Sequence, residues 1–137
     1  MELQVGVKIL LRNKAGKCLL VRRSLDKYPD ASGSWDIAGG RIEPGTALID
    51  NLKREVKEET SLDLDSTEEI RLIGAQDILR VPGKHVVRLT YTGLAAEGEV
   101  ELDKEENIEF RWLSIDEIKE MPDLCVYLKE LLDKGGL

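Results

Sequence analysis

The sequence contains few of the residues on which disulfide-rich, zinc-binding or base-stacking domains depend. Its 137 residues include one histidine, two cysteines and only 4% aromatic residues. Cys18 and Cys125 lie far apart and form no CxxC pair, so we expect neither a disulfide nor a zinc scaffold. This cysteine usage favours a reducing, cytoplasmic environment. The scarcity of aromatic rings argues against a protein that stacks on single-stranded nucleic acid.

Basic charge and long hydrophobic runs are also lacking. The chain has 20 Lys and Arg against 27 Asp and Glu, a net charge of −7 at pH 7. We therefore expect no binding to nucleic acid polymers or anionic membranes. No apolar run approaches the roughly 20 residues that span a bilayer, and the N-terminus shows no signal peptide. A small anionic ligand remains compatible, because a local site can oppose the net charge.

The hydrophobic pattern predicts one domain over residues 1–137 that mixes strands and helices. The segments that predict strands are 3–12, 18–23, 35–37, 70–81, 85–94 and 108–113. The segments that predict helices are 46–61 and 123–134, and Ser114 with Glu117 forms a capping-box pattern before a shorter one. Because the helices are dispersed among the strands, we predict an α+β fold, an α/β/α sandwich with a mixed sheet between helices.

The helix predicted over 46–61 carries three carboxylates close to its apolar face. On a helical wheel, the buried face is formed by Leu48, Ile49, Leu52 and Val56. Glu59 falls inside that apolar arc, Glu55 at its edge and Glu58 just outside it. A buried carboxylate costs several kcal/mol unless it is paired or bound to a metal. The cluster is therefore explained if a hard divalent cation such as Mg²⁺ or Mn²⁺ sits against this face.

A simpler interpretation of the same helix stays open. Glutamate is a good helix former, and Lys53, Arg54 and Lys57 are available as partners on a solvated face. The preceding turn favours the functional interpretation. The pairs Gly39-Gly40 and Pro44-Gly45 predict a tight backbone with exposed amides and carbonyls, which is typical of phosphate or metal sites.

These residues resemble the signature of the Nudix hydrolases. The family pattern is a Gly, five residues, a Glu, seven residues, Arg-Glu, an aliphatic residue, any residue, Glu-Glu, any residue, Gly and an aliphatic residue. Here Gly40 opens the pattern, segments 54–56 and 58–59 match its centre, and Leu62 closes it. Thr46 and Ser61 depart from it, standing where the family has Glu and Gly. We expect Thr46 to cap the helix through its hydroxyl, and Ser61 to be a weaker helix stop than Gly.

The resemblance implies a Nudix fold with its box at about 40–62 and hydrolysis of a diphosphate bond in a nucleoside diphosphate linked to another group. The cofactor it implies is Mg²⁺ or Mn²⁺. The metal ligands it implies are Glu55, Glu58, Glu59, Glu106 and the carbonyl of Gly39, with Arg54 assisting catalysis. The residues it implies for substrate binding are Arg23, Trp35, Gly39 and Gly40. Glu58 and a carboxylate of the 105–109 segment are both candidates for the general base.

Three of these residues also have structural interpretations from the sequence alone. Glu106 belongs equally to a solvated acidic loop, Arg23 to an exposed strand end, and Trp35 to a core or loop anchor. Their assignment to the site depends on the fold.

Chain size and the N-terminal hairpin most resemble the MutT-type enzymes, which act on nucleoside triphosphates. We therefore expect a nucleoside triphosphate pyrophosphohydrolase with a small nucleotide as its partner. Asp123 is the nearest counterpart of an Asn that reads oxidised guanine in those enzymes, and an ionised Asp only accepts hydrogen bonds. A marked preference for 8-oxo-dGTP is therefore not expected. The competing interpretation is a non-catalytic nucleotide sensor or interaction module, and the family's frequent dimers leave a homodimer open.

Overall fold

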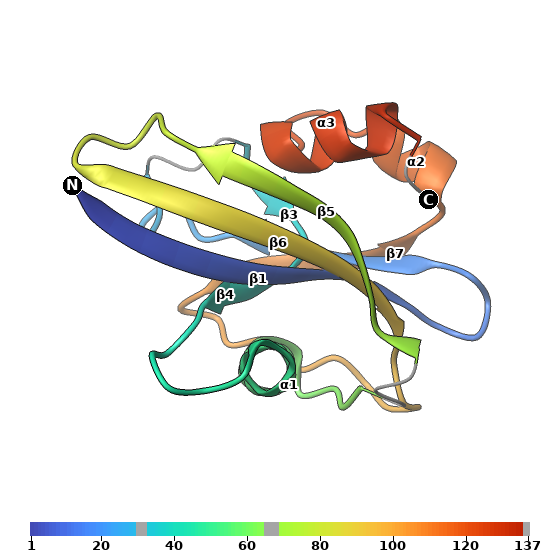
Figure 1. The fold of residues 1–137 in the computed structure, drawn as a ribbon. Helices are drawn as coiled ribbons and strands as arrows, with labels where there is room; N and C mark the ends of the chain where they lie inside the picture. The colour runs from blue at the N-terminus through green and yellow to red at the C-terminus, as the bar shows by residue number, and fades with distance from the viewer. Residues whose placement is uncertain (30–32, 65–68, 136–137) are drawn as a thin grey trace.

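The computed structural model describes residues 1–29, 33–64 and 69–135, and it shows a mixed sheet between helices (Figure 1). The strands are β1 (Glu2–Arg12), β2 (Cys18–Arg23), β3 (Trp35–Asp36), β4 (Ala38–Arg41), β5 (Arg71–Ile78), β6 (Lys84–Leu94) and β7 (Asn107–Leu113). The helices are α1 (Leu48–Thr60), α2 (Ile115–Lys119) and α3 (Val126–Asp133). Helix α1 covers one face of the sheet, and α2 and α3 cover the other. The predicted fold class is confirmed.

Strands β1 and β6 form the centre of the sheet. They run parallel and pair from Glu2 with Lys84 to Arg12 with Leu94. β5 adds to β6 in the antiparallel sense. The other edge of β1 is divided, since residues 6–9 pair with β4 and Arg12 pairs with the first residue of β2. This arrangement brings β4, with its two glycines, directly beside the middle of β1.

Alternation along the strands divides the core into two clusters. Val7, Ile9 and Leu11 of β1 pack toward α1, whereas Leu10 packs toward α2 and α3. The two-residue period of a strand explains this division. Cys18 and Cys125 both lie in the cluster beside α2 and α3 and form no disulfide, as the sequence predicted. No helix among the described residues is long and apolar enough to cross a membrane.

The strand expected at 35–37 extends further than predicted. After β3, the chain continues as β4 through both Gly39 and Gly40. A Cβ at Gly39, where φ is +143°, would collide with the carbonyl oxygen of Val7. A Cβ at Gly40 would lie 2.5 Å from Oε2 of Glu55. The glycines therefore act as pairing residues that let β4 approach β1 on one side and α1 on the other.

Helix α1 begins two residues later than predicted, and Thr46 does not cap it. Its N-cap is Ala47, which makes no side-chain capping bond. Buried Asn51 braces this turn through other contacts, donating to the carbonyls of Thr46 and Ala47 at 2.8 Å and accepting from the Glu43 amide at 2.9 Å. Leu48, expected on the buried face, is 37% exposed because it stands at the first position of the shortened helix.

The helix ends follow the sequence signals with one further difference. Ser61 takes the left-handed conformation at φ +65° as the C-cap of α1, the geometry for which the family uses glycine. Ser114 and Glu117 form the predicted capping box of α2. α3 starts at Val126 rather than at residue 123, because Asp123 has φ +59° and interrupts the helical path. Between the strands expected at 18–23 and 35–37 the sequence predicts a loop over 24–34, of which residues 30–32 lie outside the described residues.

Candidate active site

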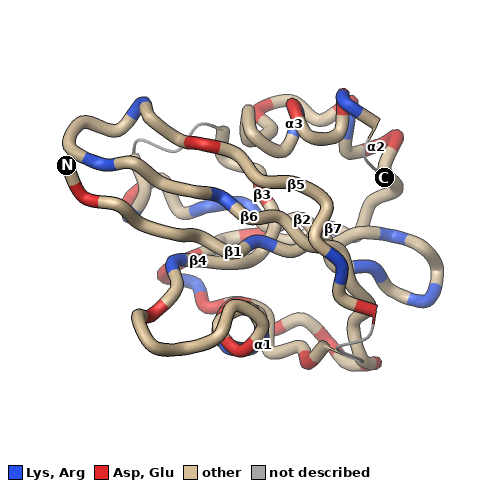
Figure 2. The backbone as a smooth tube through the Cα atoms, in the orientation of Figure 1, with Lys and Arg blue, Asp and Glu red and all other residues tan. Residues whose placement is uncertain are grey.

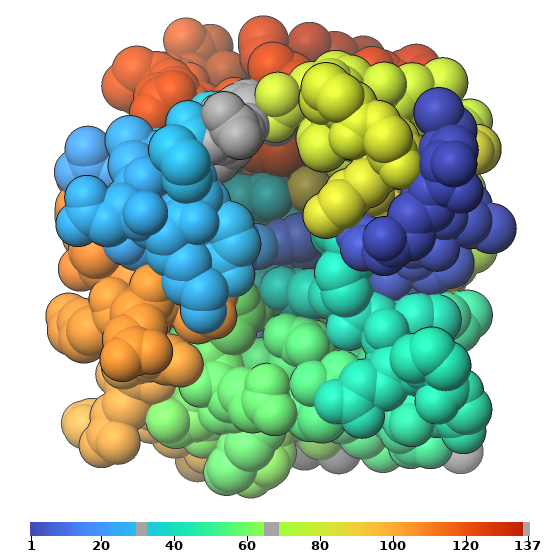
Figure 3. Space-filling model, turned by 90° about the vertical axis from the view of Figure 1, so that its left-hand side faces the viewer, coloured from blue at the N-terminus to red at the C-terminus, as the bar shows by residue number. Residues whose placement is uncertain are grey.

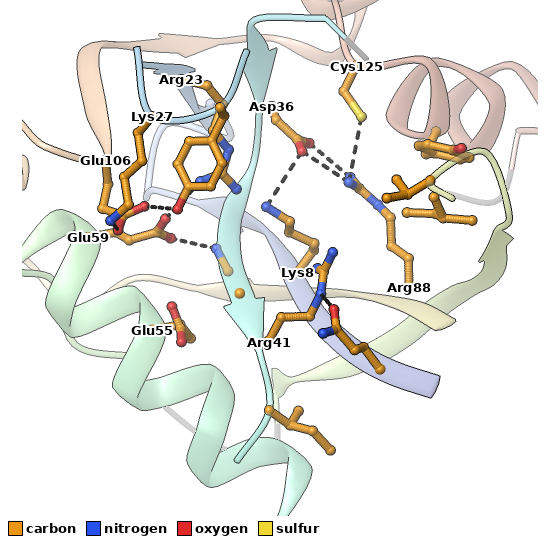
Figure 4. Close-up of a pocket in the computed structure, with 18 of the residues that line it drawn as sticks. Lys8, Arg23, Lys27, Asp36, Arg41, Glu55, Glu59, Arg88, Glu106 and Cys125 are labelled. Atoms are coloured by element: carbon orange, nitrogen blue, oxygen red, sulfur yellow. Dashed lines mark hydrogen bonds and ion pairs between the residues drawn. The ribbon is translucent and has the colours of Figure 1, made fainter. Parts of the chain in front are cut away.

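A cleft of about 860 Å³ opens at the end of the sheet where β4 lies beside β1. Figure 3 shows it as a hollow between the N-terminal strand, the segment after β2, the β5–β6 hairpin and the region of α1. Its walls carry opposite charges. α1 contributes carboxylates to one side, while basic side chains of β1 and β6 lie on the other (Figure 4). Figure 2 marks the acidic and basic positions along the backbone.

Glu59 is the buried carboxylate that the helical wheel predicted. Only 3% of the residue is exposed. Its Oε2 accepts the amide of Gly39 at 2.7 Å, and its Oε1 lies 3.2 Å from Nη1 of Arg23. The two contacts tie α1 to β4 and β2 at the rim of the cleft. The predicted burial of Glu59 is confirmed, and its charge is matched by Arg23.

Glu55 and Glu58 stand on the same wall and share Arg54. The Arg54 guanidinium lies 3.0 Å from Glu55, 3.5 Å from Glu58 and 3.7 Å from Glu43, and it donates to Oδ1 of Asn51 at 3.1 Å. Arg54 therefore has acidic partners despite the Thr at position 46. Burial raises the pKa of Glu55, and the neighbouring Glu59 raises it further. Excess negative charge therefore gathers on this wall.

This donor set fits a hard divalent cation. The three helix carboxylates line one wall, and the pKa of Glu55 is raised first by burial and then by Glu59, so a cation there would favour the ionised carboxylate. Carboxylate oxygens are the ligands that Mg²⁺ and Mn²⁺ prefer. Within residues 1–29, 33–64 and 69–135, however, no three Asp, Glu, His or Cys side chains converge on one point. The carboxylates would have to turn toward a shared ion.

Glu106 lies at the cleft with its carboxylate already engaged. It accepts hydrogen bonds from Nζ of Lys27 and the hydroxyl of Tyr28, and its backbone carbonyl accepts the Ser24 amide at 2.9 Å. Burial opposes ionisation, but the bonds from Lys27 and Tyr28 outweigh it and lower the pKa of Glu106. The solvated-loop interpretation therefore fails for this residue, because it ties the segment after β2 to the segment before β7.

Arg23 lies in the cleft, whereas Trp35 lies in the hydrophobic core. Arg23 lines the cleft with 12% of its side chain exposed, so it is not a solvent-facing strand end. Trp35 is 6% exposed, packs in the core beside α2 and α3, and has the Arg111 guanidinium 4.9 Å from its ring. Trp35 is not among the residues that line the cleft, so this structure favours the core interpretation, and substrate binding by Trp35 stays a prediction. Its buried ring holds β3 against the core beside α2 and α3, which is the role of a core anchor.

Gly39 and Gly40 line the cleft as predicted, whereas Asp123 does not. Asp123 accepts a hydrogen bond from Ser34 in the turn before α3, and its backbone carbonyl accepts the Trp35 amide at 3.1 Å. Its carboxylate thus braces a turn. The expectation about guanine recognition has to rest on other residues.

The sequence analysis missed a buried ionic cluster opposite the carboxylate wall. Asp36 accepts two hydrogen bonds from Arg88, at 2.8 and 3.0 Å, and its Oδ2 lies 3.5 Å from Nζ of Lys8 (Figure 4). Lys8 also donates to the carbonyl of Ile37 at 3.3 Å. Burial lowers the pKa of Lys8 to about 8, and nearby Arg23 acts in the same direction. The available signal was a charge at each of these positions within otherwise apolar strand patterns.

The lowered pKa of Lys8 predicts a pH-dependent stability. Lys8 titrates near pH 8 in the folded chain and near 10.5 when unfolded, so between these values the unfolded chain binds more protons. The free energy of unfolding should therefore rise with pH across this window, by roughly 1–3 kcal/mol. Urea denaturation at pH 7 to 10.5 would measure the rise in wild type and in Lys8→Met. Equal slopes in the two proteins would contradict the assignment.

Comparison with known proteins shows which sequences and structures this chain is similar to. A model of the NUDIX domain matches residues 2–133. The nucleoside triphosphatase NudI of Escherichia coli is 29% identical over 112 residues, which cover 77% of this chain and 78% of that protein. An uncharacterized Nudix hydrolase of Pseudomonas aeruginosa is 42% identical over 60 residues, which cover 42% of this chain and 34% of that protein. The MutT protein from Methanosarcina mazei has a TM-score of 0.79 and 27% identity, covering 96% of this chain and 91% of that structure.

Because the domain model spans nearly the whole chain, the chain belongs to the Nudix domain family. The Nudix fold inferred from the sequence is confirmed by the likeness to the MutT structure. The chain spans about a third of the length of the first curated relative, the Pseudomonas protein. Nudix hydrolases generally use divalent metal cations, which agrees with the carboxylate wall of α1.

Proposed function

We propose that the chain is a metal-dependent hydrolase of the diphosphate bond in a nucleoside diphosphate linked to another group, and that its substrates are nucleoside triphosphates. The observation that carries this proposal is the carboxylate wall, where Glu55, Glu58 and Glu59 line the cleft and burial raises the pKa of Glu55. The similarity to a nucleoside triphosphatase supports the choice of substrate.

In this proposal each residue of the carboxylate wall has a role in the reaction. Glu55, Glu58 and Glu59 would hold Mg²⁺ or Mn²⁺, with the carbonyl of Gly39 as a further oxygen donor. The bound cation would neutralise the diphosphate and lower the pKa of the water that attacks phosphorus. Arg54 is a positioning residue, since it touches both Glu55 and Glu58. We assign the proton of that water to Glu58, whose side chain is 57% exposed, because the other candidate, Glu106, is engaged by Lys27 and Tyr28.

The substrate side of the cleft is formed by Arg23 and β4. The planar guanidinium of Arg23 can contact two phosphate oxygens while its other edge holds Glu59. Gly39 and Gly40 present backbone without side chains, so a phosphate can come close. Glu106 would join the cation only after releasing Lys27 and Tyr28, so in this proposal it acts first as a tie between loops.

The proposed partners are a small nucleotide and a divalent cation, in a cytoplasmic setting. The net charge of −7 supports the absence of a nucleic acid polymer among them. The resemblance leaves a homodimer open, and sedimentation of the purified chain would measure whether its mass is that of a monomer or a dimer.

Product release from a substrate panel tests the proposed function. Nucleoside triphosphates, ADP-ribose and dinucleotides would be incubated with Mg²⁺, Mn²⁺ or EDTA, and phosphate and pyrophosphate would be measured. We expect metal-dependent release of pyrophosphate from triphosphates and none in EDTA. Release of phosphate alone would move the cleaved bond to the terminal phosphate. Nucleotide binding without any release would instead support the non-catalytic sensor.

A further inference from the structure

The cleft continues past β4 to the opposite face of the sheet, where a second group of residues lines it. Glu55 and Glu59 lie on the α1 side of β4, whereas Lys8, Asp36 and Arg88 meet on the other side (Figure 4). A nucleotide whose diphosphate contacts the carboxylate wall would therefore reach this second part with its nucleoside. We call the second part the far pocket and define its floor by Lys8, Asp36 and Arg88.

The pairing of β5 with β6 places apolar side chains beside this floor. Gln76 pairs with Arg88 and Ile78 with Val86, so Ile78 projects from the same face of the sheet as Arg88. Gln76 donates to the carbonyl of Tyr127 at 2.9 Å, which holds the start of α3 against this part of β5. Ile78 and Tyr127 both line the cleft. A flat ring can pack between them with one edge toward the floor.

The floor has no acceptor left for a ligand. One carboxylate oxygen of Asp36 accepts from Arg88 at 2.8 Å and from the Ile37 amide at 2.8 Å. The other accepts from Arg88 at 3.0 Å and faces Nζ of Lys8 at 3.5 Å. A carboxylate offers about four lone-pair sites, so Asp36 is saturated by the protein.

Donors, in contrast, are in surplus on the same floor. Lys8 and Arg88 bring three and five N–H groups. Lys8 has two long contacts, to the carbonyl of Ile37 at 3.3 Å and to Asp36 at 3.5 Å. Arg88 is 5% exposed, and besides its two bonds to Asp36 its Nη1 donates to Sγ of Cys125 at 3.6 Å. Within the described part of the chain its buried Nε has no hydrogen-bond partner. The three side chains also carry one net positive charge, because Asp36 offsets only one of the two cations.

We propose that the far pocket selects a nucleobase edge that presents only hydrogen-bond acceptors, the O6–N7 edge of guanine, through Lys8 and Arg88. Guanine offers two adjacent acceptors there, whereas adenine offers N7 beside an N6 amino donor. An 8-oxo-guanine carries a hydrogen on N7, so this edge also presents a donor, which would face the N–H donors of Lys8 and Arg88. The proposal thus gives the expected absence of an 8-oxo-dGTP preference a new physical basis. This proposal rests on the proposed function, because that function places the diphosphate at the carboxylate wall and therefore the base in the far pocket.

Equilibrium binding of nucleoside monophosphates in EDTA tests this proposal without requiring hydrolysis. Calorimetry would compare GMP, AMP, 7-deaza-GMP and 8-oxo-GMP on the wild-type chain, and would repeat the first two on Lys8→Met. GMP should bind at least tenfold more tightly than AMP, since a bidentate base contact is worth about 1–3 kcal/mol. Replacing N7 by carbon or adding its hydrogen should remove most of that preference, and so should Lys8→Met. Lys53→Met, on the exposed surface of α1 and outside the cleft, should keep it.

Three outcomes would overturn the proposal. GMP and AMP could bind equally, or the preference could survive Lys8→Met with 7-deaza-GMP binding as tightly as GMP. Inorganic phosphate could bind instead, with an affinity lost in Lys8→Met, which would assign the floor to an anion rather than to a base. Failure of the hydrolysis assay leaves these binding results unaffected, so the two proposals fail separately.

Discussion

Glu58→Gln is expected to lower kcat with Mg²⁺ at least a hundredfold and to leave the free energy of unfolding nearly unchanged. Glu58 is more than half exposed, and its recorded contact is the 3.5 Å approach of Arg54, so the fold does not depend on its charge. The reaction would lose a carboxylate of the metal wall and the proposed proton acceptor, and removing a general base typically costs 10²–10⁴-fold. Initial rates at saturating triphosphate, with urea denaturation of the same samples, measure both quantities.

Asp50→Asn is the matched control for this substitution. Asp50 is an exposed carboxylate in the first turn of the same helix and does not line the cleft. Its variant should keep kcat within about twofold, with a loss of stability below about 1 kcal/mol from the helix dipole. Similar kcat values for Glu58→Gln and wild type would remove Glu58 from the reaction.

Arg88→Met is expected to destabilise the fold by about 3–5 kcal/mol, the usual cost of leaving one member of a buried ion pair without its partner. Arg88 supplies the two side-chain hydrogen bonds to Asp36, which is 6% exposed. The remaining charged partner, Lys8, is 3.5 Å away and has its own pKa lowered by burial. Urea denaturation at pH 7 would show the loss as a lower midpoint with an unchanged slope.

The double variant Arg88→Met with Asp36→Asn separates charge from packing. An amide at position 36 removes the buried negative charge, so the double variant should be more stable than Arg88→Met alone. If the two substitutions simply add, the pair is not the source of the effect. A loss below about 1 kcal/mol in Arg88→Met would mean that water already reaches Asp36 in the cleft.

The sequence was sufficient for the parts of the site that lie on one element. The spacing of the three glutamates depends only on helical geometry, so the wheel placed Glu59 among apolar neighbours, and the structure confirms its burial. The same holds for Ser61 and the capping box at Ser114, whose signals are local.

The far pocket escaped prediction because it depends on strand pairing. Lys8 and Arg88 become neighbours only through the parallel pairing of β1 with β6, which no local pattern specifies. Trp35 was open to two interpretations because its exposure is set by α3, far along the chain. The turn before α1 was misjudged for a different reason. The helix begins two residues later than expected, which makes Ala47 the N-cap, and Asn51 braces the turn from one turn inside the helix.

Manganese binding tests the central claim, that the carboxylates of α1 form a divalent cation site, without any choice of substrate. Electron paramagnetic resonance of free Mn²⁺, titrated with wild type, Glu55→Gln, Glu58→Gln and Asp50→Asn, gives the affinity of each. We predict that wild type and Asp50→Asn bind Mn²⁺, with affinities at least tenfold weaker in Glu55→Gln and Glu58→Gln, as expected when a charged ligand is lost. Equal affinities in all four proteins would contradict it and place the cation elsewhere.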